Sequence, residues 1–333
     1  MKKLINDPER FVDEMLEGLL LAHPDQLRAA SADNRALVRA DAPRQGRVGI
    51  VTGGGSGHLP TFLGYVGEGL CSGVAVGNVF SSPSAEQVLE ATKASDGGAG
   101  VLYLYGNYGG DVLNFDLAAD MAELEDIETR TVLLTDDVAS QPKERSADRR
   151  GVAGLFFAYK CAGAAAERGD DLAAVADAAQ AAADSTRTMG IGLSPTILPT
   201  VGKPTFELEE GEMEVGIGIH GEPGIHRGPL ESADAVTDRL LEPIVADLVL
   251  GEGERVAVLV NGLGATPLEE LYLVYRRVHA RLSQLGVTIE RRYVGEYATS
   301  LEMAGASVSV MRLDDRTSAL LAAPARSPFF EQR

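Results

Sequence analysis

The stretch Arg47-Val-Gly-Ile-Val-Thr-Gly-Gly-Gly-Ser-Gly-His58 runs from an apolar segment into a glycine-rich loop, and it indicates the fold class of the chain. Residues 47–52 have the apolar and β-branched character of a buried strand. Glycines allow a sharp turn after a strand and let the backbone approach an oxyanion closely. Because the loop ends in His58, we interpret it as a candidate site rather than as a plain turn.

Strands and helices alternate along the whole sequence on either side of this stretch. This alternation predicts two α/β domains, each a β-sheet layered with helices. A Gly/Pro/Thr-rich connection near residues 186–200 predicts an N-terminal domain over 1–187 and a C-terminal domain over 188–333. Further strands are expected at 73–77, 101–105, 131–135, 214–219, 256–261, 288–293 and 308–313. Helices are expected after Asp7-Pro8 and at 84–95, 112–121, 151–169, 170–185 and 267–285.

Composition narrows the possible partners. The chain has 333 residues and a formal net charge of −19, which argues against binding to nucleic acid or to an anionic membrane. The N-terminus lacks the features of a signal peptide, and no apolar run is long enough for a membrane span, so we expect a cytoplasmic protein. The cysteines Cys71 and Cys161 form no metal-ligand cluster, and no metal site is expected.

Two further glycine-rich stretches carry candidate functional residues. Gly106-Asn-Tyr-Gly-Gly-Asp111 follows the strand expected at 101–105, and His220 lies in the stretch 213–224, where small neighbours leave its imidazole open to a ligand. His220, His58 and Asp111 are therefore the groups that we expect to transfer protons at a small ligand. Asp111 could also be the N-cap of the helix expected at 112–121, and the two roles do not exclude each other.

Other patterns in the sequence receive weaker interpretations. The spacing Gly216-x-Gly218-x-x-Gly221 formally matches a dinucleotide fingerprint, but the residues that follow cannot open the helix that such a site needs, which argues against a dinucleotide oxidoreductase. We interpret these glycines as clearance around His220. The chain also contains no G-x-x-x-x-G-K-[ST] phosphate loop. The adjacent carboxylates Asp136-Asp137 are interpreted as solvated, and no role is assigned to the three other histidines.

Six short stretches, taken in order along nearly the whole chain, resemble the K subunit of dihydroxyacetone kinases, the ketose-binding component. Each stretch alone would be weak evidence, and together they are specific. They are Gly53–His58, Gly106–Phe115, Asp136–Ala139, Gly216–Gly224, Val260–Gly264 and Thr299–Gly305.

The resemblance implies roles for particular residues. It implies a homodimer in which His220 attacks the carbonyl of a short ketose and holds the substrate as a hemiaminal. By the same resemblance, His58 assists proton transfer, and Asp111 deprotonates the terminal hydroxyl that attacks phosphorus. Gly54 and Gly55 would lend backbone amides to the substrate.

The resemblance also implies that this chain binds no cofactor itself. The nucleotide, ATP or an ADP recharged by a phosphotransferase system, would lie with Mg on a separate L-type subunit. Two positions depart from the family pattern, because Leu59 and Phe62 stand where the family usually has glutamate and histidine. These departures keep two alternatives open: a kinase component for the four-carbon ketose erythrulose, and a non-enzymatic ketose-sensing transcriptional co-regulator.

Overall fold

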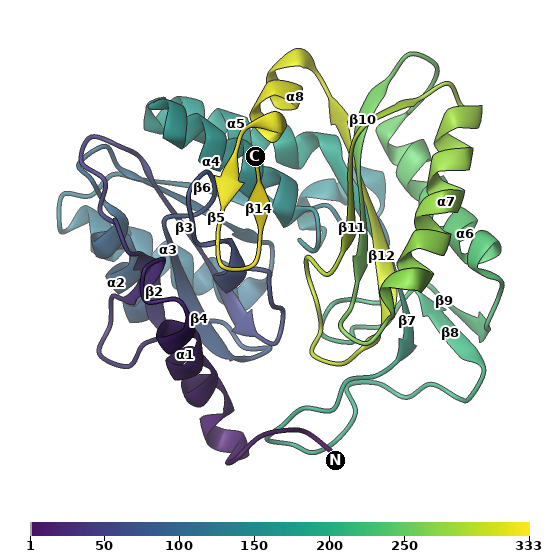
Figure 1. Cartoon of the computed structure of the whole chain (residues 1–333), viewed down its shortest axis with the longest axis horizontal. Helices are drawn as coiled ribbons and strands as arrows, with labels where there is room; N and C mark the ends of the chain where they lie inside the picture. Colours follow the sequence, from purple (N-terminus) through teal and green to yellow (C-terminus); the bar gives the residue numbers. More distant parts are fainter. Residues whose placement is uncertain (1) are drawn as a thin grey trace. The chain divides into compact units, whose positions relative to one another are not determined.

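The computed structural model describes residues 2–333, which form two compact units (Figure 1). Unit 1 comprises the chain up to Leu134 together with Leu155–Ala182 and Thr317–Arg333, and unit 2 comprises Thr135–Gly154 and Ala183–Arg316. Each unit contains one six-stranded sheet and helices of its own. The predicted fold class, two α/β units that each layer a sheet with helices, is confirmed.

The sheet of unit 1 has the strand order β1-β2-β4-β3-β5-β6. The four strands β4, β3, β5 and β6 run parallel, and β2 and β1 join antiparallel at one edge. Because β3 and β5 are parallel neighbours, the loops at their carboxyl ends meet at one edge of the sheet. The strands are β1 (Leu27–Ala29), β2 (Ala36–Arg39), β3 (Gly49–Ser56), β4 (Gly73–Val79), β5 (Val101–Gly106) and β6 (Thr129–Leu134).

Two helices of unit 1, η1 and α2, begin where their capping residues predict. The Asp7 side chain accepts a hydrogen bond from the Glu9 amide, and Ser84 forms a capping box with Gln87 at the start of α2. The α3 helix starts two residues before Asp111, with Tyr108 at the N-cap position, so the N-cap interpretation of Asp111 is wrong. The helices are η1 (Pro8–Arg10), α1 (Phe11–Ala22), η2 (Leu63–Tyr65), α2 (Ala85–Ser95), α3 (Gly109–Glu123), α4 (Leu155–Arg168), α5 (Leu172–Ser185) and α8 (Asp315–Ala322); the short strands β13 (Ala325–Arg326) and β14 (Glu331–Gln332) close the chain.

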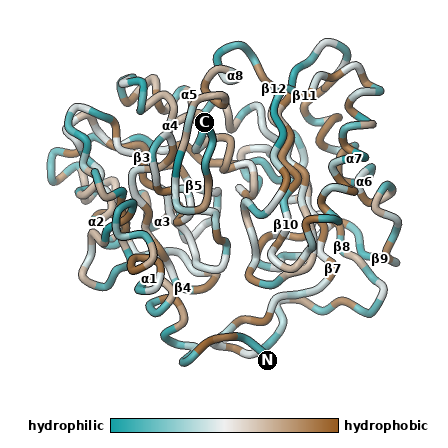
Figure 2. The backbone as a smooth tube through the Cα atoms, viewed as in Figure 1, coloured by the Kyte–Doolittle hydropathy of each residue, from teal (hydrophilic) through white to brown (hydrophobic). Residues whose placement is uncertain are grey.

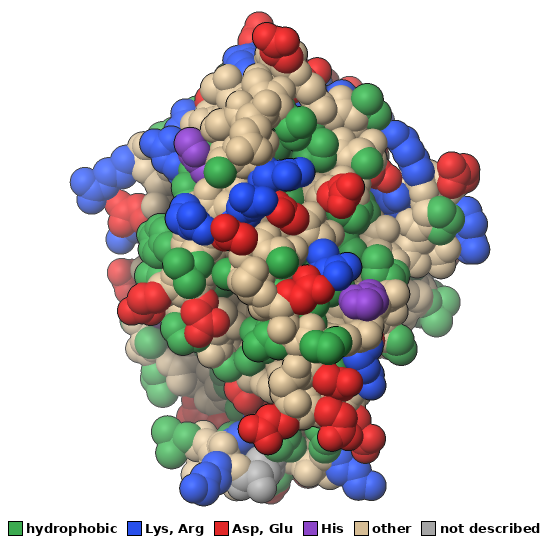
Figure 3. All heavy atoms as spheres, turned by 90° about the vertical axis from the view of Figure 1, so that its right-hand side faces the viewer, with side chains coloured by type: hydrophobic (Ala, Val, Ile, Leu, Met, Phe, Trp, Pro, Cys, Tyr) green, Lys and Arg blue, Asp and Glu red, His purple; other side chains and the backbone are tan. Residues whose placement is uncertain are grey.

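The sheet of unit 2 has the strand order β11-β10-β12-β7-β8-β9 and is antiparallel except for β10 and β11. The α6 and α7 helices bury an apolar core against it, and Figure 2 shows apolar residues along the central strands. On the face in Figure 3, acidic and basic side chains are interspersed. The elements are η3 (Lys143–Asp148), β7 (Thr186–Ser194), β8 (Glu212–Val215), β9 (His226–Pro229), α6 (Ala233–Leu248), β10 (Arg255–Gly262), α7 (Leu268–Gln284), β11 (Thr288–Gly295) and β12 (Ala304–Leu313).

Three of the differences from the sequence-based expectations concern β7, β8 and the bounds of the two units. Residues 186–194, expected in a connection, form the inner strand β7, because Met189 and Ile191 are buried in the core and the strand pairs with β12. The strand expected at 214–219 ends at Val215, since Gly216 adopts a φ of +79° that no strand continues through. Units 1 and 2 do not have the bounds of the predicted domains 1–187 and 188–333, because residues 135–154 belong to unit 2 and residues 317–333 belong to unit 1.

No helix within residues 2–333 combines the length and the apolar character that a membrane span requires.

Candidate active site

His58 lies just beyond the carboxyl end of β3, in unit 1, and its side chain is held by aromatic rings. The residue is only 2% exposed. Its ring stacks on Phe80, with 4.8 Å between the ring centroids and 12° between the planes, and it meets Phe62 edge-on at 6.1 Å and 78°. Aromatic contacts of this kind fix the plane of a ring. The loop that the sequence singled out therefore presents a positioned imidazole.

Gly54 and Gly55, which precede His58, leave no room for a side chain, because other residues pack closely against β3. A Cβ atom on Gly54 would lie 2.4 Å from the ring of Phe62, and one on Gly55 would lie 2.6 Å from the backbone nitrogen of Ser81. Either contact is far shorter than a normal van der Waals separation. Phe62, one of the departures from the family pattern, thus forms a wall directly over Gly54.

The peptide groups of Gly54 and Gly55 lie beyond the part of β3 that pairs with β5. That pairing ends at Val51, whereas the pairing with β4 continues through both glycines. Backbone groups in a strand point alternately to its two sides. The expected use of these amides in substrate binding is thus compatible with the pairing, and it stays a prediction.

Asp111 lies in the first turn of α3, close to the same region of unit 1. Its side chain is buried, with a relative exposure of 6% for the residue. A Cβ atom on Gly110 would lie 2.6 Å from the Ser82 hydroxyl, so the start of α3 packs against the segment 80–82 whose Phe80 stacks on His58. A helix N-terminus is a favourable position for a carboxylate. The structure thus brings the two glycine-rich loops of unit 1 to a common segment.

His220 lies in unit 2, in the turn that follows β8, and a carboxylate holds its ring. Nδ1 is 2.9 Å from Oε1 of Glu222, and the His220 backbone amide donates to Oε2 of the same carboxylate at 2.9 Å. The His220 side chain is 26% exposed. An imidazole that is fixed on one side and reachable from solvent is suited to act on a small ligand.

The glycines around His220 shape its turn and leave room for the side chain of Glu222. Gly216 and Gly221 have positive φ angles of +79° and +90°, which shape the turn. A Cβ atom on Gly218 would lie 2.1 Å from Oε2 of Glu222 and 2.3 Å from Nη1 of Arg150. At Gly216 and Gly218 an added Cβ atom would meet neighbours other than His220, whereas the expected clearance that Gly221 gives the imidazole stays a prediction.

A network of charges continues from Glu222 into unit 2. Arg150 lies 3.8 Å from Oε2 of Glu222 and donates to Asp137 through Nε at 2.9 Å and Nη2 at 2.7 Å. Burial opposes ionisation of Glu222, but the hydrogen bond and charge of His220, a backbone hydrogen bond and the charge of Arg150 lower its pKa to about 2. Glu222 is therefore ionised at neutral pH.

The acidic pair before this network is buried, so its interpretation as solvated is wrong. Asp136 has no exposed surface and accepts hydrogen bonds from the amides of Val152 and Gly154, each at 2.9 Å. Asp137 is 3% exposed, and burial raises its pKa to about 6 despite the nearby charge of Arg150. Together the two carboxylates hold the two ends of the segment 135–154 together, and the Thr188 amide donates to the Asp136 carbonyl at 2.7 Å.

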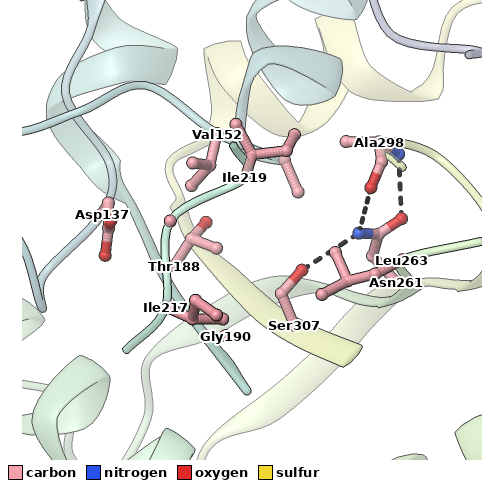
Figure 4. Close-up of a pocket in the computed structure, with 12 residues that line it drawn as sticks. Asp137, Val152, Thr188, Gly190, Ile217, Ile219, Asn261, Leu263, Ala298 and Ser307 are labelled. Carbon is pink, nitrogen blue, oxygen red and sulfur yellow. Dashed lines mark hydrogen bonds between the residues drawn. The ribbon is translucent and has the colours of Figure 1, made fainter. Parts of the chain in front are cut away.

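A pocket of unit 2 lies beside the His220 turn (Figure 4). The turn contributes Ile217, Gly218 and Ile219 to its lining. On another side, the Asn261 side chain donates to the carbonyl of Ala298 at 2.8 Å and to the Ser307 hydroxyl at 3.1 Å. These hydrogen bonds hold the polar wall of the pocket in place. The other lining residues are Asp137, Val152, Ala153, Thr188, Gly190 and Leu263.

The sequence-based reasoning missed two residues of this region. Glu222 received no role from the sequence, although its place two residues after His220 was a usable signal, because a carboxylate at this spacing can reach back to the histidine ring. Arg150 is 70 positions away from His220 and left no local signal. Among residues 2–333, no group of three or more His, Cys, Asp or Glu side chains could hold a metal ion.

The two α/β units, with a histidine and a carboxylate on strand-end loops of one and a carboxylate-bound histidine in the other, match a known class of protein. The Dak1 domain model matches residues 17–329, and the chain belongs to this family. Its sequence is 47% identical to the dihydroxyacetone-binding subunit DhaK of a PTS-dependent dihydroxyacetone kinase from Listeria innocua, over 99% of both chains. The predicted family membership is confirmed.

Three other relatives bear on the function. A D-erythrulose kinase of Mycolicibacterium smegmatis is 44% identical over the whole of this chain, which spans 57% of that protein. The crystal structure of the dihydroxyacetone kinase of C. freundii superposes with a TM-score of 0.90 at 31% identity, over 99% of this chain and 60% of that one. A structure described as the dihydroxyacetone kinase operon co-activator Dha-DhaQ gives a TM-score of 0.89 at 30% identity, over 96% and 99% of the two chains.

Proposed function

We propose that this chain is the ketose-binding subunit of a dihydroxyacetone kinase, a phosphotransferase that acts on an alcohol group. The observation that carries the proposal is His220, which is held through Nδ1 by an ionised carboxylate in a partly exposed turn. The names of the relatives, dihydroxyacetone and erythrulose kinases, support the same class of substrate.

The first step is covalent capture of the ketose. The Nε2 atom of His220 attacks the carbonyl carbon, a C–N bond forms, and the carbonyl π electrons move to oxygen, which takes a proton from water. The resulting hemiaminal carries its positive charge on the imidazole ring, next to the carboxylate of Glu222. Polyols such as glycerol lack the electrophilic carbon and would not be captured.

The second step is phosphoryl transfer to the terminal hydroxyl of the captured ketose. Asp111 takes the hydroxyl proton as the oxygen attacks phosphorus and the bond to the donor breaks, while His58 assists proton transfer. The amides of Gly54 and Gly55 bind the substrate. The donor, ATP or an ADP recharged by a phosphotransferase system, lies with Mg on a separate L-type subunit, and the chain acts as a cytoplasmic homodimer.

The four-carbon ketose erythrulose is the leading alternative substrate. The D-erythrulose kinase at 44% identity favours it, and so does the wall that Phe62 forms over Gly54, because an apolar ring changes the shape and polarity beside His58. The affinities of one protein preparation for dihydroxyacetone and for erythrulose decide which of the two is the substrate.

A sensing role is the second candidate function. The likeness to the operon co-activator favours it. Asp111 distinguishes the two functions, because binding a ketose needs no general base. A chain whose Asp111→Asn variant loses turnover but keeps ketose binding is a kinase subunit, and a chain with no turnover under any donor condition is a sensor.

The proposal is tested by intact-protein mass spectrometry after incubation with dihydroxyacetone or erythrulose, with reductive trapping and peptide mapping. We expect a ketose-sized adduct on His220, and the loss of both the adduct and turnover with an L-type subunit in His220→Ala. The matched control is His226→Ala, which alters an exposed histidine six residues away. A crystal soak backs up a negative trapping result, because hemiaminals reverse easily. Turnover that is unchanged in His220→Ala would refute the proposal.

A further inference from the structure

The contacts of Glu222 point to a device that sets which nitrogen of His220 is reactive. One carboxylate accepts twice from the same residue, through Oε2 from the His220 amide and through Oε1 from Nδ1, each at 2.9 Å. An ionised carboxylate can only accept hydrogen bonds, so Nδ1 must carry the proton. In a neutral imidazole the lone pair then lies on Nε2.

Two further residues keep this carboxylate in its place. Arg150 lies 3.8 Å from Oε2 of Glu222 and is itself fixed by Asp137, and it also donates to the carbonyl of Gly216 at 3.3 Å. Gly218 leaves the space in which the carboxylate and the guanidinium meet, because a Cβ atom there would lie within 2.3 Å of both groups. A simple turn contact would need neither an anchored arginine nor this clearance.

We propose that Glu222 is a positioning residue that holds His220 in the Nδ1–H tautomer and so makes Nε2 the atom that attacks the ketose. The same carboxylate stabilises the positive charge that appears on the ring when the C–N bond forms. Arg150 and Gly218 act through Glu222, Arg150 by holding the carboxylate and Gly218 by admitting it. The proposal rests on the proposed function, because the attack on a ketose is part of it, whereas the tautomer can be observed without any ligand.

The first measurement is the pair of ¹⁵N chemical shifts of the His220 ring at neutral pH in the ¹⁵N-labelled protein. We expect a protonated Nδ1 and an unprotonated Nε2 in the wild-type chain, and a loss of this preference in Glu222→Ala. Gly218→Ala should have the same effect although it leaves His220 and Glu222 in the sequence. Glu231→Gln is the matched control, since it alters another carboxylate paired to an arginine in the same unit.

The second measurement is the affinity for dihydroxyacetone and for erythrulose by isothermal titration calorimetry. Glu222→Ala should weaken binding of the accepted ketose about tenfold or more, the size expected for a lost charge-assisted hydrogen bond. Glu222→Gln retains the shape and an acceptor oxygen but removes the charge, so its affinity should fall between those of the wild type and Glu222→Ala. Circular dichroism establishes that each variant is folded.

The outcomes separate this inference from the proposed function. A wild-type ring that carries its proton on Nε2 overturns the inference, and so does a folded Glu222→Ala variant with unchanged tautomer and affinity. The expected tautomer in a chain that binds neither ketose supports the positioning role of Glu222 and refutes the proposed function. The expected tautomer together with weakened ketose binding in Glu222→Ala supports both.

Discussion

The Phe62 ring lies directly over Gly54, so we expect substitutions at these two positions to be coupled in their effect on the free energy of unfolding. In Gly54→Ala, the new methyl group would lie 2.4 Å from the Phe62 ring, and the ring must move until the separation reaches at least the 3.4 Å of an ordinary contact. Overpacking of this kind costs about 1–3 kcal/mol. Phe62→Ala should itself cost about 2 kcal/mol, less than a fully buried phenylalanine, because the ring is only partly buried.

The double variant tests the geometry directly. With the ring gone, the methyl group at position 54 enters vacated space, so Gly54→Ala/Phe62→Ala should be about as stable as Phe62→Ala alone, a coupling of about 1–3 kcal/mol. Urea unfolding followed by far-UV circular dichroism measures this, since the chain has no tryptophan. Gly18→Ala is the control, because nothing lies near its Cβ position in α1, and it should stabilise the chain slightly. Additive effects within about 0.5 kcal/mol would refute the reasoning.

Three further predictions concern unit 2. Asp247→Asn should lower the free energy of unfolding, measured in urea, by about 3–5 kcal/mol, because it leaves the buried guanidinium of Arg149 without its carboxylate. A loss below about 1 kcal/mol would contradict the buried ion pair. Asn261→Ala should lower the free energy of unfolding by about 2–4 kcal/mol, because the amides of Ala298 and Tyr297 lose the acceptor that they reach at 2.9 and 2.8 Å. Hydrogen exchange of these two amides should become faster, and unchanged or slower exchange would argue against the prediction. The low pKa of Glu222, about 2 against its ordinary 4.5, stabilises the folded state above pH 4.5, and this stabilisation is lost as the pH falls towards 2. The stability difference between the wild type and Glu222→Gln should therefore narrow between pH 6 and pH 3 in urea titrations, and a constant difference would contradict this pH dependence.

Local signals in the sequence were sufficient for the elements that carry the site. The apolar run before Gly53 and the one before Gly106 both form parallel strands, because a strand buried on both faces needs no more than a continuous apolar segment and a turn. The helix expected at 84–95 also formed, and Ser84 and Gln87 make the capping box at its start. Such features depend on neighbours within a few residues, and this is the range that sequence periodicity reports.

Features that depend on distant segments could not be predicted in this way. Residues 186–194 contain three glycines or serines and read as a connection, yet β12 supplies the partner strand that makes them an inner strand. The burial of Asp136 depends on amides from the segment 152–154, and the contact of Glu222 with Arg150 joins positions 72 residues apart. The residue pattern of one segment carries no information on which distant segment will pair with it, bury it or form its ion pairs.

The two histidines of the proposed mechanism are positioned by different means, and this bears on which role each can take. Stacking on Phe80 fixes the plane of the His58 ring, whereas the Glu222 carboxylate fixes which nitrogen of His220 carries the proton. A nucleophile needs a defined lone pair and a partner for the charge that appears on it, and a carboxylate at Nδ1 supplies both. A group that passes protons in both directions needs a fixed position but no single tautomer. The environments therefore favour His220 as the nucleophile and His58 as the proton-transfer group.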